Sequence, residues 1–81
     1  MIELKFKFNP VKDVVYATVT AIRGRDIVYT INVHSNEFGE GSDTSVGHEH
    51  MSDDEWDRIR ICLRHYRMGM IKQKEGRLFC E

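Results

Sequence analysis

The chain begins with a regular alternation of apolar and charged residues. The even positions from Ile2 to Phe8 are apolar, and the odd positions between them are charged. This period of two is typical of a strand that buries one face. Asn9-Pro10 is expected to end the strand, because proline cannot donate a hydrogen bond to a sheet and restricts the residue before it.

Two further segments, 13–22 and 27–34, are rich in Val, Ile, Thr and Tyr and predict a hairpin with a turn at Gly24-Arg25. This turn sets the pairs of the face that we expect to be core, which are Ile22–Ile27, Thr20–Tyr29, Thr18–Ile31 and Tyr16–Val33. The opposite face is half apolar and is expected to be partly covered or to contact a partner; it carries Val15, Ala17, Val19, Ala21 and Val28 with Thr30, Asn32 and His34.

Residues 35–51 predict a long acidic loop that is rich in glycine and serine. Loops longer than about 12–15 residues are uncommon in compact domains and are usually functional or disordered. Both interpretations stay open here, because a polar and acidic composition is also typical of disorder.

A helix is predicted to start at Ser52, which forms a capping box with Glu55. Its apolar residues recur every three or four positions, as expected of a helix that lies on a sheet; they are Trp56, Ile59, Leu63, Tyr66 and Met70. The helix ends either at Gly69 or at Gly76. A short last strand over 77–80 is an alternative for the end of the chain.

These elements predict a single α+β domain over residues 1–81. It has two layers, an antiparallel sheet of three or four strands and one helix packed across it, and each layer hides the apolar face of the other. The residues expected in the core are Leu4, Phe6, Phe8, Tyr16, Ile22, Tyr29, Ile31, Val33, Trp56, Ile59, Leu63 and Tyr66.

Composition adds an uneven distribution of charge. The net charge is −1, yet residues 37–57 hold eight acidic side chains and no Lys or Arg. Residues 58–77 hold seven basic side chains and one acidic one. Charges separated in this way give a folded domain distinct poles, provided that the two blocks stay apart in space. A helix with acids at its start and bases at its end is the simpler interpretation of the same pattern.

Two groups of residues suggest chemistry, and both signals are weak. His48 and His50 are spaced to share a metal ion, with His34 or Asp53 as a third ligand, but a pair of exposed loop histidines is the favoured interpretation. Cys62 lies one helical turn from His65, but the pair lacks a group that would orient the histidine. No other enzyme signature is present, so we predict neither a catalytic residue nor a cofactor.

The helix carries a basic flank formed by Arg60, Arg64 and Arg67. Ile61 and Met68 are seven residues apart and point away from the apolar stripe, so they are exposed unless something covers them. Apolar residues beside arginines are typical of a protein–protein contact. A solvated flank with isolated surface hydrophobes is the alternative.

Direct binding of nucleic acid is less expected than binding of a protein. The basic segment 58–77, with Tyr66 and His65, could hold phosphates and bases, but the isoelectric point of about 6.4 is far below that of a dedicated nucleic-acid binder. The acidic block instead suggests a surface that occupies a basic groove, where complementary charge speeds encounter and selects the partner.

The sequence therefore predicts a non-enzymatic protein that binds the basic surface of another protein. In size and charge it resembles phage-encoded inhibitors of host defence, such as anti-CRISPR proteins, although no motif carries residue roles over from them. A homodimer is the alternative assembly, and a cytoplasmic location without a membrane segment is expected. The predicted partner-binding residues are Glu37, Glu40, Asp43, Glu49, Asp53, Asp54, Asp57, Arg60, Ile61, Arg64, Arg67 and Met68.

Overall fold

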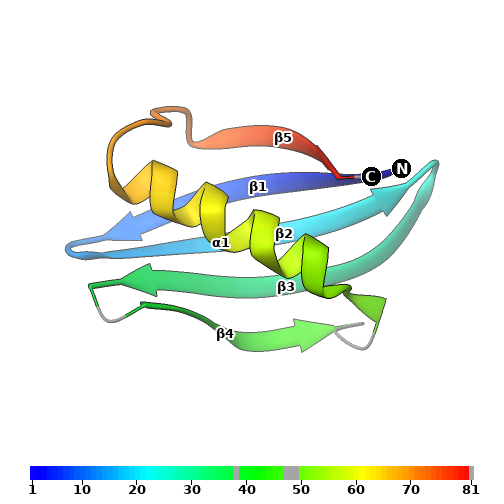
Figure 1. Cartoon of the computed structure of the whole chain (residues 1–81), viewed down its shortest axis with the longest axis horizontal. Helices are drawn as coiled ribbons and strands as arrows, with labels where there is room; N and C mark the ends of the chain where they lie inside the picture. Colours follow the sequence, from blue (N-terminus) through cyan, green and yellow to red (C-terminus); the bar gives the residue numbers. More distant parts are fainter. Residues whose placement is uncertain (38, 47–49, 81) are drawn as a thin grey trace.

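One antiparallel sheet and one helix make up the fold, with α1 lying diagonally across one face of the sheet (Figure 1). The computed structural model describes residues 1–37, 39–46 and 50–80. This arrangement confirms the predicted α+β class. The spatial order of the five strands is β4-β3-β2-β1-β5. In chain order the elements are β1 (Ile2–Val11), β2 (Val14–Arg23), β3 (Asp26–Asn36), β4 (Gly39–Val46), α1 (Asp53–Arg67) and β5 (Glu75–Cys80).

Strand β1 continues past the proline that was expected to end it. Pro10 pairs with Val15 of β2, and the strand runs to Val11. Strand β5 pairs with β1 only between Ile2 and Lys7, so Pro10 lies where no described strand borders the outer edge of β1. Proline is tolerated at such an edge position, because the missing N–H interrupts no hydrogen bond to a neighbouring strand.

The hairpin of β2 and β3 forms as predicted, but its register differs from the predicted one. Ile22 pairs with Ile27 as expected, whereas a β-bulge between Ala21 and Ile22 makes Val19 the partner of Ile31. One extra residue exchanges the two faces of a strand, because side chains alternate between them. The face that buries Val15, Ala17, Val19 and Ala21 is therefore the core face.

Three corrections follow from this exchange of faces. Tyr16 and Ile22 were predicted to be core residues, but Tyr16 is exposed and Ile22 is only half-buried. Ile27 is exposed at the end of the hairpin. The face away from the helix is also not half apolar, because β2 contributes Tyr16, Thr18 and Thr20 to it rather than valines and alanines.

The segment predicted as a loop contains an edge strand. Gly39–Val46 forms β4, which pairs with β3 and has a bulge opposite Asn32 and Val33. Its glycines and small polar residues gave no alternating apolar signal, because an edge strand has little to bury. Residues 47–49 lie outside the described part of the chain. The short strand suggested for the C-terminus is present as β5, beside β1.

The helix begins where the capping box predicts and ends at the earlier of the two glycines. The Ser52 side chain accepts a hydrogen bond from the Glu55 backbone N–H, and the Glu55 side chain accepts one from the Ser52 backbone N–H. Gly69 has φ of +79° and follows the last turn, a conformation that glycine adopts without strain. Met70 lies beyond this end and is exposed, so it is not part of the buried stripe.

The core lies between α1 and the three central strands. Ile59 and Leu63 of the helix are buried against the apolar face of β1, β2 and β3, which includes Leu4, Val19 and Ile31. Trp56 and Tyr66, both predicted core residues, pack against this cluster while remaining partly exposed. Within the described residues, no helix has both the length and the apolar character needed to cross a membrane.

Candidate interaction surfaces

The outward face of α1 carries the two exposed apolar residues that the sequence singled out. Ile61 is 49% exposed and Met68 is 64% exposed. Asp54 stands seven residues before Ile61 and belongs to the same helix face, because seven residues are close to two full turns. The stripe formed by Asp54, Ile61 and Met68 points away from the sheet. We call it the outer stripe.

The basic flank of the helix is held by the chain itself. Arg64 donates from Nε to Glu40 Oε1 of β4 at 3.2 Å, and its second guanidinium nitrogen lies 3.2 Å from the same oxygen. Arg67 donates to the backbone carbonyl of Asn36 at the end of β3. The flank therefore joins the helix to the β3–β4 edge of the sheet.

A third arginine is paired within the helix. Arg60 donates to Asp57 Oδ1 at 2.8 Å, one helical turn away, and both side chains are largely exposed. Together with Arg64–Glu40, this pair brings acidic and basic side chains together that the sequence places in separate blocks. The two blocks are therefore not wholly separate territories in the fold.

Several predicted acidic residues point to solvent. Asp53 and Asp54 are exposed in the first turn of α1, and Glu37 is exposed in the turn after β3. Asp43 belongs to β4, but its side chain lies outside the described part of the structure, as does the whole of Glu49. Asp53 and Asp54 therefore lie at the N-terminal end of the helix, whereas Glu37 lies near its C-terminal end, beside Tyr66 and Arg67.

The predicted histidine site is divided between described and undescribed residues. His48 lies outside the described residues, His50 lies just before the helix, and His34 belongs to β3. Among the described residues, no three His, Cys, Asp or Glu side chains are grouped closely enough to hold a metal ion. His34 is placed instead beside Tyr16, with the two ring centroids 6.3 Å apart.

Cys62 occupies a packing position at the edge of the helix stripe. It is half-buried against the core cluster, beside the buried Ile59 and Leu63. This position is that of a small apolar side chain, as is usual for cysteines at the edge of a core. Cys80 stands at the end of β5, and its side chain lies outside the described part of the structure.

Two contacts that the sequence did not predict fasten the ends of the helix to the sheet. Near the start of α1, the Tyr29 hydroxyl donates to Glu55 Oε2 at 3.0 Å, and both residues are buried. Near its end, the Tyr66 ring stacks on Phe8 with centroids 4.1 Å apart. The capping box had identified Glu55, but its partner on β3 depends on the tertiary fold.

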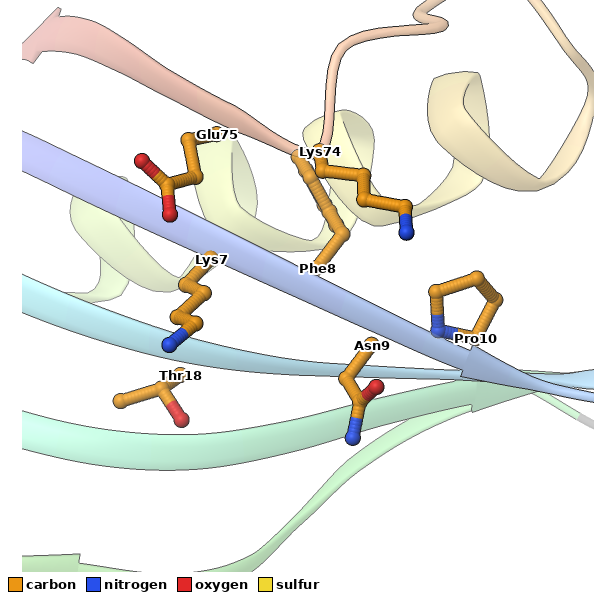
Figure 2. Close-up of a pocket in the computed structure, with 7 residues that line it drawn as sticks. All are labelled: Lys7, Phe8, Asn9, Pro10, Thr18, Lys74 and Glu75. Atoms are coloured by element: carbon orange, nitrogen blue, oxygen red, sulfur yellow. The ribbon is translucent and has the colours of Figure 1, made fainter.

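A hollow of about 540 Å³ opens at the edge of the sheet where β5 begins. The polar side chains around it include Lys7, Asn9 and Thr18 of β1 and β2 and Lys74 from the segment before β5 (Figure 2). Phe8, Pro10 and Glu75 complete the lining. Sequence reasoning missed this hollow, because it brings together residues from the two ends of the chain.

The chain was compared with models of known protein families, with curated proteins and with solved structures, and none of the three comparisons gave a match.

Proposed function

We propose that this protein is a non-enzymatic binding protein that contacts another protein through the outward face of α1. The observation that carries the proposal is the exposure of Ile61 and Met68 on one helix face. Large apolar side chains bordered by charged residues are typical of the centre of a protein interface, where they become buried on binding. The partner would supply a shallow apolar recess for these two side chains.

The charges around the outer stripe suggest a partner with a basic surface. Asp53 and Asp54 are exposed at one end of the stripe, without an arginine partner among the described contacts. Lysine or arginine residues on the partner would speed encounter and favour one orientation. Glu40 and Asp57 contribute less because each faces an arginine, and Glu37 lies near the other end of α1, beside Tyr66 and Arg67.

The helix is suited to this role because it is held rigidly on the sheet. The Tyr29–Glu55 hydrogen bond fixes its first turn, and the Phe8–Tyr66 stack fixes its last turn. A surface that is already ordered loses less conformational entropy on binding. The paired flank of Arg60, Arg64 and Arg67 gives the stripe a polar rim of fixed shape.

A finer form of the proposal concerns the class of partner. The small size and the acidic residues of 37–57 are similar to those of phage-encoded inhibitors of host defence. In such a role, the acidic end of the helix would occupy a basic groove that otherwise holds a phosphate backbone. The partner would then be a component of a nucleic-acid-handling complex, and binding would compete with its nucleic acid.

Affinity capture with matched variants tests the proposal. The chain is immobilised and exposed to a lysate of the cells in which it acts. Each captured protein is then purified, and its affinity for the chain is measured directly. The double variant Ile61→Asp/Met68→Asp is expected to lose the partner. Ile27→Asp is the control, because Ile27 is also an exposed isoleucine but lies at the far end of the hairpin. Equal binding by the helix variant would refute the use of the outer stripe.

The electrostatic part has its own test. With the purified partner, Asp53→Asn/Asp54→Asn should lower the association rate and weaken its dependence on salt. Circular dichroism checks that the helix remains, since acids in its first turn also stabilise it by about 0.3–1 kcal/mol each. Light scattering addresses the homodimer. If the chain forms a dimer that Ile61→Asp/Met68→Asp dissociates, the partner at the outer stripe is a second copy of the chain and not another protein.

A further inference from the structure

The sheet face opposite the helix has a composition that fits neither a core nor an apolar interface. Strand pairing aligns Lys7, Thr18 and Asn32 in one row across β1, β2 and β3. The next row toward the hairpin end holds Lys5, Thr20 and Thr30. Because α1 covers only the other side, these hydroxyl, amide and ammonium groups face solvent. We call this side the open face.

The open face is positively charged although the whole chain is not. Lys5 and Lys7 point outward from β1, and Arg77 stands beside Lys5 in β5. Two carboxylates share the face, and one of them, Glu3, is 3.2 Å from Arg77 Nε. The exposed acids of α1 lie on the opposite side of the sheet. The low isoelectric point of the chain therefore does not describe this surface.

The hollow at the edge of this face has the donors that a phosphate needs. Lys7 and Lys74 provide two exposed ammonium groups, and Asn9 adds an amide. The Thr18 hydroxyl of the same lining donates to Asn32 Oδ1 at 3.0 Å. None of the described hydrogen bonds or ion pairs engages the side chain of either lysine. Among the described residues of the lining, Glu75 is the one carboxylate, so these residues together carry an excess positive charge of one. Its volume of about 540 Å³ leaves ample room for a phosphate group.

An aromatic ring stands beside the hollow on the same face. Tyr16 pairs with Asn9 across β1 and β2 and is 40% exposed. On its other side, Tyr16 packs at a tilt against His34. The imidazole of His34 lies over Gly41 of β4, where an added Cβ would be only 3.1 Å from the ring. Glycine at this position leaves room for the ring that supports Tyr16.

We propose that the open face binds single-stranded nucleic acid. A backbone phosphate occupies the hollow between Lys7 and Lys74, the next phosphates follow Lys5 along β1, and a base stacks on Tyr16. A groove of positive charge with an adjacent aromatic ring is the combination by which proteins bind single strands without reading sequence. This site lies on the other side of the sheet from the outer stripe, so one molecule can hold a strand and a protein together.

Fluorescence anisotropy with a labelled oligothymidylate of about 16 nucleotides tests the site. Three neutralised phosphates predict a slope of about −2 for the logarithm of affinity against the logarithm of salt concentration. Affinity should then fall about 15- to 20-fold when salt is raised from about 50 to about 200 mM. Lys7→Gln/Lys74→Gln is expected to weaken binding at least about tenfold at low salt and to make the slope about 0.7 less steep, because the hollow holds one phosphate.

Matched variants separate this site from general attraction between charges. Arg25→Gln/Arg58→Gln removes the same charge from the hairpin turn and the helix, and it should change affinity less than about twofold. Tyr16→Leu keeps the net charge and should weaken binding about 5- to 150-fold, the effect of losing one base stack. Thermal unfolding confirms that each variant is folded.

Several results would overturn the proposal. One is the absence of binding at low salt, and another is an equal loss in the control pair. A third is unchanged affinity of Tyr16→Leu, which would leave only non-specific attraction for polyanions. Ile61→Asp/Met68→Asp should bind the oligonucleotide with unchanged affinity. The result for nucleic acid is therefore independent of the proposed protein contact through α1.

Discussion

The buried hydrogen bond between Tyr29 and Glu55 offers a sharp test of how the helix is fixed to the sheet. Tyr29→Phe removes only the hydroxyl that donates to Glu55 Oε2, and the ring keeps its place in the core. The carboxylate would then lose a donor at a site where Glu55 is only 7% exposed, so water replaces that donor poorly. We expect the variant to fold with the same structure and lower stability.

The size of the loss follows from the nature of the bond. A hydrogen bond with a charged partner contributes about 1.5–3 kcal/mol, and a volume-conserving change adds no cavity. Tyr29→Phe should therefore lower the free energy of unfolding by about 2 kcal/mol. In a domain of this size that corresponds to a fall in Tm of about 8–16 °C. Glu55→Ala should cost more, about 3–4 kcal/mol, because it also removes the bond that caps Ser52.

Urea unfolding followed by circular dichroism measures these differences. A double-mutant cycle of Tyr29→Phe and Glu55→Ala isolates the coupling between the two side chains, which we expect to be about 1–2 kcal/mol. Tyr16→Phe is the control, since Tyr16 is exposed and its change should stay within about 0.5 kcal/mol. If Tyr29→Phe is as mild as the control and the cycle shows no coupling, the hydrogen bond does not hold the helix.

Three further predictions address the core, the helix end and the flank. Leu63→Ala, at a site with no exposed surface, should lower the free energy of unfolding by about 3–5 kcal/mol in urea titrations, and a loss below about 1 kcal/mol would contradict the core assignment. Gly69→Ala should cost about 1–2 kcal/mol because of its positive φ, whereas Gly76→Ala, which meets no atom within 4 Å, should be close to neutral in the same assay. A double-mutant cycle of Arg64→Ala and Glu40→Ala should give a coupling of at most about 1 kcal/mol that falls with salt, because the Arg64 side chain is 52% exposed although that of Glu40 is only 12% exposed. A larger, salt-independent value would show that this pair is more than a surface ion pair.

Strong local signals predicted β1, the β2–β3 hairpin and α1. The apolar alternation of β1 and the capping box of α1 each depend on residues a few positions apart, and both elements begin where the sequence indicates. The hairpin turn was also located correctly. The register of the hairpin was not, because one extra residue, Val28 of β3 opposite the step from Ala21 to Ile22, leaves no mark in the composition of the strand.

The candidate surfaces were predictable to different degrees. The exposure of Ile61 and Met68 follows from helix geometry once the buried stripe is known. The pairing of Arg64 with Glu40 was not predictable, because it requires that a polar segment without periodicity forms β4 beside β3. The hollow beside Lys7 and Lys74 was missed for a similar reason, since 66 residues separate its two lysines along the chain.

The sequence by itself therefore determined the class of fold, the start of the helix and the residues that the helix buries, because periodicity and capping are properties of neighbouring residues. Only the tertiary structure decided which face of β2 is buried and how acidic and basic side chains meet. It alone also brought Lys7 and Lys74 together at the edge of the sheet. These features arise from one bulge and from two edge strands, and the positions of edge strands are set by the sheet that they join rather than by their own sequence.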